Sequence, residues 1–270
     1  MISFPNAKIN LGLHVIDKRS DGFHNIETCF YPISWNDALE VIPAKETVFT
    51  SSGIAIPGDA SSNLCLKAYQ AIKEQYNIQP VHIHLHKNIP IGAGLGGGSS
   101  DAAYTSTLVN SIFNLNMTNG QLEDSVRNLG SDCAFFIQNK PLIAHEKGDR
   151  FTDINCIDLS SYWIYLIHPG IHVSTKDAYN NILPNADRAA IKTSLQAPIE
   201  TWKETLVNDF EKSVFALFPA IANLKEQFYK HGAVYAAMSG SGSAVFGIFK
   251  DKPTQFTKND KMKSMITKML

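Results

Sequence analysis

Strict alternation between apolar and polar positions predicts two half-buried strands in the first hundred residues. Apolar side chains occupy every odd position over residues 7–15, and they alternate with three histidines over residues 81–86. A period of two places one face of a strand on a core and leaves the other face polar. Residues 26–33 follow an Asp21-Gly22 turn signal, so we expect them to form the return strand of a hairpin.

Helical spacing and capping residues predict the helices between these strands. Two serines, Ser61 and Ser62, cap a helix that runs to about residue 76, and Thr118 with Gln121 forms a capping box before the next helix. The remaining expected elements are helices over residues 202–218 and 220–230, strands over 163–167, 234–238 and 244–249, a short helix capped by Thr175, and an amphipathic helix or frayed end after Lys250.

This mixture of elements predicts an α/β fold of the α+β type, in which helices pack on mixed or antiparallel sheets. At 270 residues the chain is long enough for two cores. Residues 140–160 are polar and contain a Gly148-Asp149 turn, so we expect the boundary there. The predicted domains are residues 1–150 and residues 151–270.

Composition narrows the class of protein. Apolar residues make up 44% and charged residues 18% of the chain, which is typical of a globular protein, and the net charge of −1 gives no reason to expect a nucleic acid or a membrane as partner. Four scattered cysteines, Cys29, Cys65, Cys133 and Cys156, predict buried free thiols in a reducing compartment. We see no signal peptide or membrane span and therefore expect a cytoplasmic protein.

The chemistry is concentrated in the run PIGAGLGGGSSD, which begins at Pro90. Five of the residues from Gly92 to Gly98 are glycines. Glycine allows φ > 0 and lets a ligand approach the backbone closely. Peptide N–H groups at the start of a helix attract anions, and we expect a helix over residues 99–116 with Ser99 or Ser100 as its cap. The run is therefore predicted to cradle phosphate.

Two known phosphate-binding templates fit this loop incompletely. The dinucleotide-binding spacing G-x-G-x-x-G is present, but the preceding strand alternates, and no acidic residue lies about 20 positions beyond to hold a ribose. Gly98 stands where a Walker A loop needs lysine, although Ser99 matches its hydroxyl. A lysine that contacts the phosphates must therefore come from elsewhere. A flexible linker is the plainer alternative, but it would not join a regular strand to a regular helix.

Polar residues elsewhere are candidates for the same site. Lys8 and Asn10 project from one strand face because they are two positions apart. Asp132 lies between a helix and an apolar run, where it is either a helix cap or a buried catalytic carboxylate. Phe23 and His24 could stack on a flat ring and hydrogen-bond to it, although local evidence alone favours a surface position.

Two further patterns have simple structural explanations. His82, His84 and His86 share one strand face and could bind zinc, but no carboxylate or cysteine is close in sequence, so a solvated sheet face is preferred. The segment Ser239 to Ser243 is a second glycine-rich turn between two strands. Taken alone, it reads as a simple hairpin turn.

Together these motifs resemble the GHMP kinase superfamily, which includes galacto-, homoserine, mevalonate and phosphomevalonate kinases. The run from Pro90 fits its central motif, P-x-G-x-G-L-G-S/G-S/G-S. Three segments, AKINL at residues 7–11, DGFH at 21–24 and GSDC at 130–133, resemble the branch that phosphorylates a cytidyl diphosphate alcohol in non-mevalonate isoprenoid biosynthesis. The likeness extends from about residue 4 to residue 249.

The resemblance implies a two-domain GHMP kinase fold with the active site in the cleft between an N-terminal ATP-binding domain and a C-terminal substrate-side domain. It implies ATP and Mg²⁺ as cofactors. The residues it assigns are Lys8 and Asp132 for catalysis; Asn63, Lys87, Pro90, Ile91, Gly92, Ala93, Gly94, Leu95, Gly96, Gly97, Gly98, Ser99 and Ser100 for ATP; Asn10, Phe23, His24, Thr175 and Tyr179 for the substrate; Gly240, Ser241 and Gly242 as a third glycine motif; and Ser99 or Ser100 for Mg²⁺.

The expected reaction is phosphoryl transfer from ATP to a hydroxyl of a small cytidyl diphosphate alcohol. Asp132 would accept the proton of that hydroxyl, and Lys8 would keep the carboxylate ionised. We expect a monomer or weak homodimer. The alternatives are another GHMP kinase of the mevalonate or homoserine type, a non-catalytic nucleotide-binding regulator on the same fold, and a dinucleotide oxidoreductase.

Overall fold

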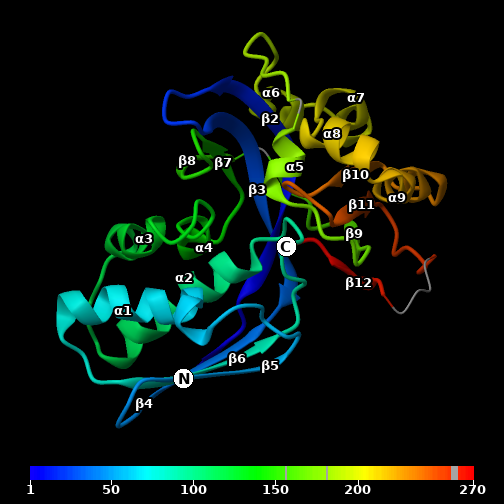
Figure 1. The fold of residues 1–270 in the computed structure, drawn as a ribbon. Coiled ribbons are helices and arrows are strands. Elements are labelled where there is room, and N and C mark those ends of the chain that lie inside the picture. The colour runs from blue at the N-terminus through cyan, green and yellow to red at the C-terminus, as the bar shows by residue number, and fades with distance from the viewer. Residues whose placement is uncertain (156, 181, 257–260) are drawn as a thin grey trace. The chain divides into compact units, whose positions relative to one another are not determined.

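The computed structural model describes residues 1–155, 157–180, 182–256 and 261–270, which form a mixture of helices and sheets (Figure 1). The chain divides into two compact units. Unit 1 comprises residues 1–7, 35–91 and 96–140, and unit 2 comprises residues 8–34, 92–95 and 141–270. Because the chain passes between the units several times, the expected single boundary after residue 150 does not describe this division. The last passage lies between Lys140 and Pro141.

Unit 1 is built on a four-stranded sheet with the order β1-β4-β6-β5. Its strands are β1 (Ile2–Ser3), β4 (Ala38–Pro43), β5 (Val48–Gly53) and β6 (Val81–Lys87). Strand β6 is antiparallel to β4 and parallel to β5. The odd-numbered residues of β6 are buried, as their alternation predicted. The histidines between them bond to hydroxyls of β5, namely Thr50 and Ser52.

Unit 1 also contains helices, some of which pack against this sheet. They are η1 (Ala60–Ser62), α1 (Leu64–Tyr76), α2 (Gly97–Ile112), α3 (Asn119–Arg127) and α4 (Phe135–Gln138). Helices α1 and α2 lie side by side in Figure 1. The core joins Leu39 and Ile83 of the sheet to Tyr69 of α1 and Val109 of α2. The capping box of Thr118 and Gln121 is confirmed, whereas α1 is capped by Asn63 rather than by Ser61 or Ser62.

Unit 2 contains two antiparallel sheets. The first has the order β2-β3-β7-β8 and consists of β2 (Asn6–Lys18), β3 (His24–Asn36), β7 (Leu142–His145) and β8 (Arg150–Asp153). The second has the order β10-β11-β9-β12 and consists of β9 (Trp163–His168), β10 (Tyr235–Met238), β11 (Val245–Phe249) and β12 (Lys263–Lys268). The ends of β2 and β3 that carry residues 6–7 and 35–36 belong to unit 1.

The helices of unit 2 are short. They are α5 (Thr175–Tyr179), α6 (Ile191–Gln196), η2 (Ile199–Thr201), α7 (Trp202–Thr205), α8 (Phe210–Leu217) and α9 (Pro219–Lys230). A core cluster joins Val15 of β2, Tyr165 of β9 and Val245 of β11 to Val214 of α8 and Phe228 of α9. This cluster fixes β2, the strand that carries Lys8 and Asn10, against the second sheet.

Three sequence predictions about these elements are wrong. The expected helix over residues 202–218 is interrupted, because the Asn208 side chain bonds to Met238 and Gly240 and the Asp209 carboxylate bonds to the Val15 amide. The expected helix or frayed end after Lys250 contains a strand, β12, which pairs with β9. Ser174, rather than Thr175, caps α5.

The cysteines agree with expectation where the structure describes them. Cys29, Cys65 and Cys133 are buried free thiols, and Cys156 lies outside the described residues. Among the described helices, none combines the length and the apolar character that crossing a membrane requires.

Candidate active site

The glycine loop changes units in its middle. Gly92 to Leu95 belong to unit 2, and Gly96 onward belongs to unit 1, where α2 begins at Gly97. Gly96 is the residue that precedes α2, with φ of 69°, so neither Ser99 nor Ser100 is its cap. The Ser100 amide already bonds to the Gly96 carbonyl at 2.9 Å. In an α-helix the amides before this bond have no acceptor within the helix, so those of Gly97, Gly98 and Ser99 suit an anion.

Asp132 lies in the turn between α3 and α4, and this turn packs near the first turn of α2. A side chain at Gly130 would come within 3.3 Å of the Cys133 sulfur and 3.4 Å of the Ser99 hydroxyl. Glycine therefore lets the Asp132 turn lie close to Ser99. Burial raises the pKa of the Cys133 thiol to about 12, so this cysteine stays protonated beside the carboxylate. Asp132 itself is half-buried.

Lys87, predicted to bind ATP, lies in a buried ionic cluster of unit 1. Its ammonium bonds to Asp37 and, at 2.6 Å, to Asp101 of α2. Burial alone would lower the pKa of Lys87, but the Asp101 and Asp37 carboxylates outweigh it and raise the value. Asp37 also accepts hydrogen bonds from the amides of Asn88 and Ile89, which lead into the loop. The cluster thus ties β6 to the start of α2.

Asn63, which is also predicted to bind ATP, makes a structural hydrogen bond of its own. Its side chain accepts a 2.8 Å hydrogen bond from the Cys65 amide and caps α1. It is half-buried. An ATP contact at Asn63 therefore remains a prediction.

Lys8 and Asn10 point to the same side of β2, as their spacing predicted, and they touch. The Lys8 ammonium donates to the Asn10 side-chain oxygen at 2.7 Å and to the Gly94 carbonyl at 3.2 Å. It also lies 4.6 Å from the centre of the Phe30 ring. Both Lys8 and Asn10 are buried. The structure therefore brings the predicted catalytic lysine to the unit 2 half of the glycine loop.

The turn at residues 239–243 supports the glycine loop rather than being a hairpin turn alone. A side chain at Gly94 would lie 2.0 Å from the Ser239 carbonyl oxygen, so only glycine allows this contact. The Ser239 hydroxyl donates to the Gly94 carbonyl at 2.9 Å, and the Ala244 amide donates to the Ala93 carbonyl at 3.1 Å. The predicted third motif, Gly240 to Gly242, lies within this turn.

Two of the residues predicted to bind the substrate, His24 and Tyr179, are in contact in unit 2. His24, not Phe23, stacks on Tyr179, with ring centres 4.7 Å apart and planes inclined by 23°. Phe23 is 60% exposed, and the Lys147 ammonium lies over its ring. Burial, helped by Lys18, lowers the pKa of His24, so its ring is neutral at pH 7. Thr175 is exposed at the start of α5.

Comparison with known proteins decides the family. The family model described as GHMP kinases N terminal domain matches residues 63–140, and GHMP kinases C terminal matches residues 190–264. A 4-diphosphocytidyl-2-C-methyl-D-erythritol kinase of Cytophaga hutchinsonii is 66% identical over 259 residues, which cover 96% of each chain. One of Azobacteroides pseudotrichonymphae is 51% identical and covers 93% of this chain and 94% of its own.

The chain belongs to the 4-diphosphocytidyl-2-C-methyl-D-erythritol kinase family of GHMP kinases. A crystal structure titled 4-(cytidine 5'-diphospho)-2C-methyl-D-erythritol kinase agrees, with a TM-score of 0.78 and 31% identity over 92% of this chain and 89% of that one. The mevalonate kinase of Methanococcus jannaschii has a TM-score of 0.71 at 13% identity and covers 100% of this chain and 98% of its own. At that identity the likeness concerns the fold alone.

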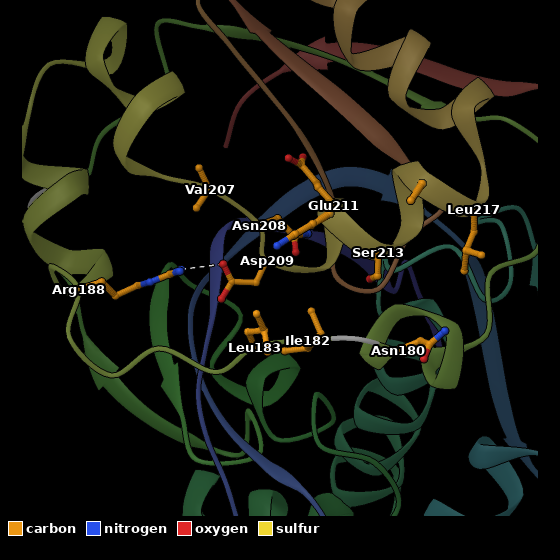
Figure 2. A pocket seen from close by; sticks show the side chains of 12 residues that line it. Asn180, Ile182, Leu183, Arg188, Val207, Asn208, Asp209, Glu211, Ser213 and Leu217 are labelled. Atoms are coloured by element: carbon orange, nitrogen blue, oxygen red, sulfur yellow. Dashed lines mark hydrogen bonds and ion pairs between the residues drawn. The ribbon is translucent and has the colours of Figure 1, made fainter.

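This member of the kinase family has a cavity of about 570 Å³ in unit 2 (Figure 2). Arg188 bonds to Asp209 at 2.7 Å on one side of it. None of the predicted site residues is among its described lining, which consists of Asn180, Ile182, Leu183, Arg188, Val207, Asn208, Asp209, Glu211, Lys212, Ser213, Ala216 and Leu217. Asn208 links the cavity to the third glycine motif, because its amide donates to Gly240.

The zinc alternative finds no support in the described parts of this kinase-family chain. Among those residues, no group of three or more histidine, cysteine or acidic side chains is placed to hold a metal. The ring nitrogens of His82, His84 and His86 instead bond to Thr50 and Ser52 at 2.8–3.1 Å. This confirms the interpretation of a polar sheet face.

Sequence reasoning missed three residues that hold the site. Thr28 bonds to Asn10, Ser239 bonds to Gly94, and Asp37 bonds to Lys87. Each partner is at least 18 positions away in sequence. No local motif identifies such contacts. The signal that was available is the position of Thr28 on the return strand of the hairpin that begins with Lys8 and Asn10.

Proposed function

We propose that the protein transfers the γ-phosphoryl group of ATP to the 2-hydroxyl of 4-diphosphocytidyl-2-C-methyl-D-erythritol, a step of non-mevalonate isoprenoid biosynthesis. The single observation that carries this proposal is 66% identity over 96% of both chains with a protein of that kinase name. The glycine loop supports it, because phosphoryl transfer depends mainly on positioning and on charge neutralisation.

In the proposed mechanism the loop amides hold the ATP phosphates. The amides of Gly97, Gly98 and Ser99 lie at the start of α2, where the helix dipole favours negative charge. Asp132 accepts the proton of the attacking hydroxyl, and the Lys8 ammonium stabilises charge on the phosphoryl oxygens. Asn10 orients the ammonium through the 2.7 Å hydrogen bond that joins the two side chains.

Mg²⁺ fits the chemistry of the residues at the start of α2. It is a hard ion that takes oxygen ligands and keeps several waters when it is bound with substrate phosphates. Ser100 is fully buried, whereas Ser99 is half-buried, so we assign Ser99 as the hydroxyl that the ion can reach. When bound, Mg²⁺ neutralises phosphate charge.

The stacked pair of His24 and Tyr179 is the proposed surface for the cytosine ring. A neutral imidazole carries one donor and one acceptor nitrogen, which suits the polar edge of a nucleobase. Phe23 and Thr175 are exposed and complete the proposed substrate set. We further propose that the protein is a cytoplasmic enzyme with a small-molecule substrate and that it acts as a monomer or weak homodimer.

The first test is mass spectrometry of the products after incubation with ATP, Mg²⁺ and the cytidyl diphosphate alcohol. We expect a product heavier by one phosphoryl group. Mevalonate and homoserine tested in the same way should remain unchanged. Phosphorylation of mevalonate alone would indicate a different GHMP kinase, and ATP binding without any turnover would indicate a regulator.

Asp132→Ala tests the proposed general base. We expect turnover to fall by about 10²-fold or more, because a positioned base contributes at least that much. ATP affinity, measured by calorimetry without the alcohol, should stay near the wild-type value, since the carboxylate acts on the hydroxyl. Turnover close to wild type would remove Asp132 from the mechanism.

A further inference from the structure

Thr28 is a buried hydroxyl that no sequence motif singled out and that the proposed mechanism does not use. It lies on β3 and has no exposed surface. Its hydroxyl group donates a hydrogen bond to the Gly12 carbonyl at 2.5 Å and accepts one from the side-chain NH₂ of Asn10 at 3.0 Å. Both partners are on β2, the strand that carries Lys8. Thr28 therefore connects the backbone of β2 at Gly12 to the Asn10 side chain of the predicted site.

The direction of these hydrogen bonds is fixed from both ends. The Gly12 carbonyl can only accept a hydrogen bond, so Thr28 must donate its single hydroxyl proton to this carbonyl. Thr28 can then only accept, so Asn10 must turn its NH₂ group toward Thr28. At the other end the Lys8 ammonium can only donate, and it faces the Asn10 oxygen at 2.7 Å. A flipped Asn10 amide would fail at both contacts.

Gly12 provides the first acceptor in a series of hydrogen bonds that continues through Thr28 and Asn10 to Lys8. Its φ of 67° turns the backbone in the middle of β2, and an added side chain would come within 2.6 Å of Ile191 and 2.8 Å of Leu206. The positive φ favours glycine at this position, whose carbonyl accepts from Thr28. The remaining members, Asn10 and Lys8, are 1% and 3% exposed, so water does not compete for their bonds.

We propose that Thr28 is a positioning residue for the reaction, because the series Gly12–Thr28–Asn10–Lys8 sets the orientation of the Asn10 amide and thereby the place of the Lys8 ammonium. This inference rests on the proposed function, in which Lys8 stabilises the transferred phosphoryl group. Thr28 acts through Asn10 and does not touch the substrate. Its removal affects the chemical step rather than ATP binding.

Thr28→Val removes the hydroxyl and keeps the shape of the side chain. We expect kcat to fall about 10-fold or more, because small misplacements of a catalytic group are costly, while the KM for ATP stays unchanged. Thr28→Ser, which restores the hydroxyl, should recover most of kcat. Thr105→Val is the matched control, because Thr105 is equally buried but its hydroxyl bonds to the Asp101 carbonyl within α2. We expect wild-type kcat for this control.

A spectroscopic measurement tests the series without any turnover. The side-chain NH₂ resonances of Asn10 in the ATP-free protein should shift in Thr28→Val and return in Thr28→Ser. Should Thr28→Val fail to fold, Thr28→Cys replaces it, and its weak thiol should leave kcat several-fold below that of Thr28→Ser.

The outcomes separate this inference from the proposed function. An inactive wild-type protein would refute the proposed substrate, and the Asn10 resonances would still decide whether Thr28 fixes the amide. Wild-type kcat in Thr28→Val, or unshifted Asn10 resonances, would overturn the positioning role. A rise in the KM for ATP without a change in kcat would also overturn it.

Discussion

Two buried lysines, Lys8 in unit 2 and Lys87 in unit 1, contact different kinds of groups. Each is 3% exposed. Lys87 bonds to two carboxylates, Asp37 and Asp101. Within its own unit, Lys8 is held by the neutral oxygens of Asn10 and Gly94 and by the face of the Phe30 ring. Lys87 thus has two carboxylate partners, whereas the Asn10 and Gly94 oxygens that accept from Lys8 are neutral.

The difference indicates which lysine can act on a phosphate. Two carboxylates compensate the Lys87 charge, and the cluster carries a net charge of −1 when all three groups are ionised. The Asn10 and Gly94 oxygens accept hydrogen bonds from the Lys8 ammonium and fix its position. Preorganised charge of this kind stabilises developing negative charge in a transition state. We propose that the Lys87 ammonium has mainly a structural role and that the Lys8 ammonium acts on the phosphates of ATP.

Removing the Lys87 ammonium should have the largest effect on stability. Lys87→Met leaves the Asp37 and Asp101 carboxylates buried without their shared cation, which costs about 3–5 kcal/mol of unfolding free energy. Denaturant unfolding measures this loss. Lys250→Met is the control, because Lys250 and Glu200 form an ion pair at the surface, and its removal should leave stability nearly unchanged. Equal losses in the two variants would contradict the comparison.

Lys8→Met should show the reverse pattern. We expect the rate of phosphoryl transfer in a single turnover to fall about 10²-fold, the typical cost of losing one group that stabilises transition-state charge. The loss of unfolding free energy should be smaller than in Lys87→Met, because the Asn10 and Gly94 oxygens that accept from Lys8 are neutral and do not become unpaired buried charges. A change in ATP affinity with an unchanged transfer rate would show that Lys8 acts in binding alone.

Asp101→Asn should sharpen the comparison through pH. Burial raises the pKa of the Asp101 carboxyl group to about 7, although the Lys87 ammonium opposes this shift. The unfolded carboxyl loses its proton near pH 3.8 and the folded one near pH 7, so wild-type stability falls as pH rises between these values. We therefore expect the stability of the variant relative to wild type to rise between pH 4 and pH 8, by up to about 4 kcal/mol. Thermal unfolding of both proteins across this pH range measures the difference in stability.

The sequence predicted most of what depends on neighbouring residues. The alternating strand β6, the apolar strand β9 and the capping box of α3 are local patterns, and all are confirmed. Strand β2 is present as predicted, but both of its faces are buried up to Val15, so it is not half-buried. Lys8 and Asn10 were expected on one face and lie in contact. The family followed from motifs that are contiguous in the chain, since the glycine loop and the Asp132 turn can be recognised without any tertiary structure.

The wrong predictions arise where distant residues decide. The segment after Lys250 has a helix-like distribution of lysines, but pairing with β9, about a hundred residues earlier, turns part of it into β12. Residues 206–209 leave the helical path because Asn208 and Asp209 bond to Met238 and Val15. Thr28 was overlooked for the same reason, since its bond to Asn10 joins two strands.

The glycine loop is also uneven in what it tolerates. At Gly94 a single added carbon would collide with the Ser239 backbone, whereas at Gly98 it would lie 3.6 Å from a methyl group of Leu64, an ordinary contact. Gly98 is exposed at the first turn of α2. A cysteine introduced there could carry a fluorophore that reports nucleotide arrival, whereas Gly94 would have to stay glycine.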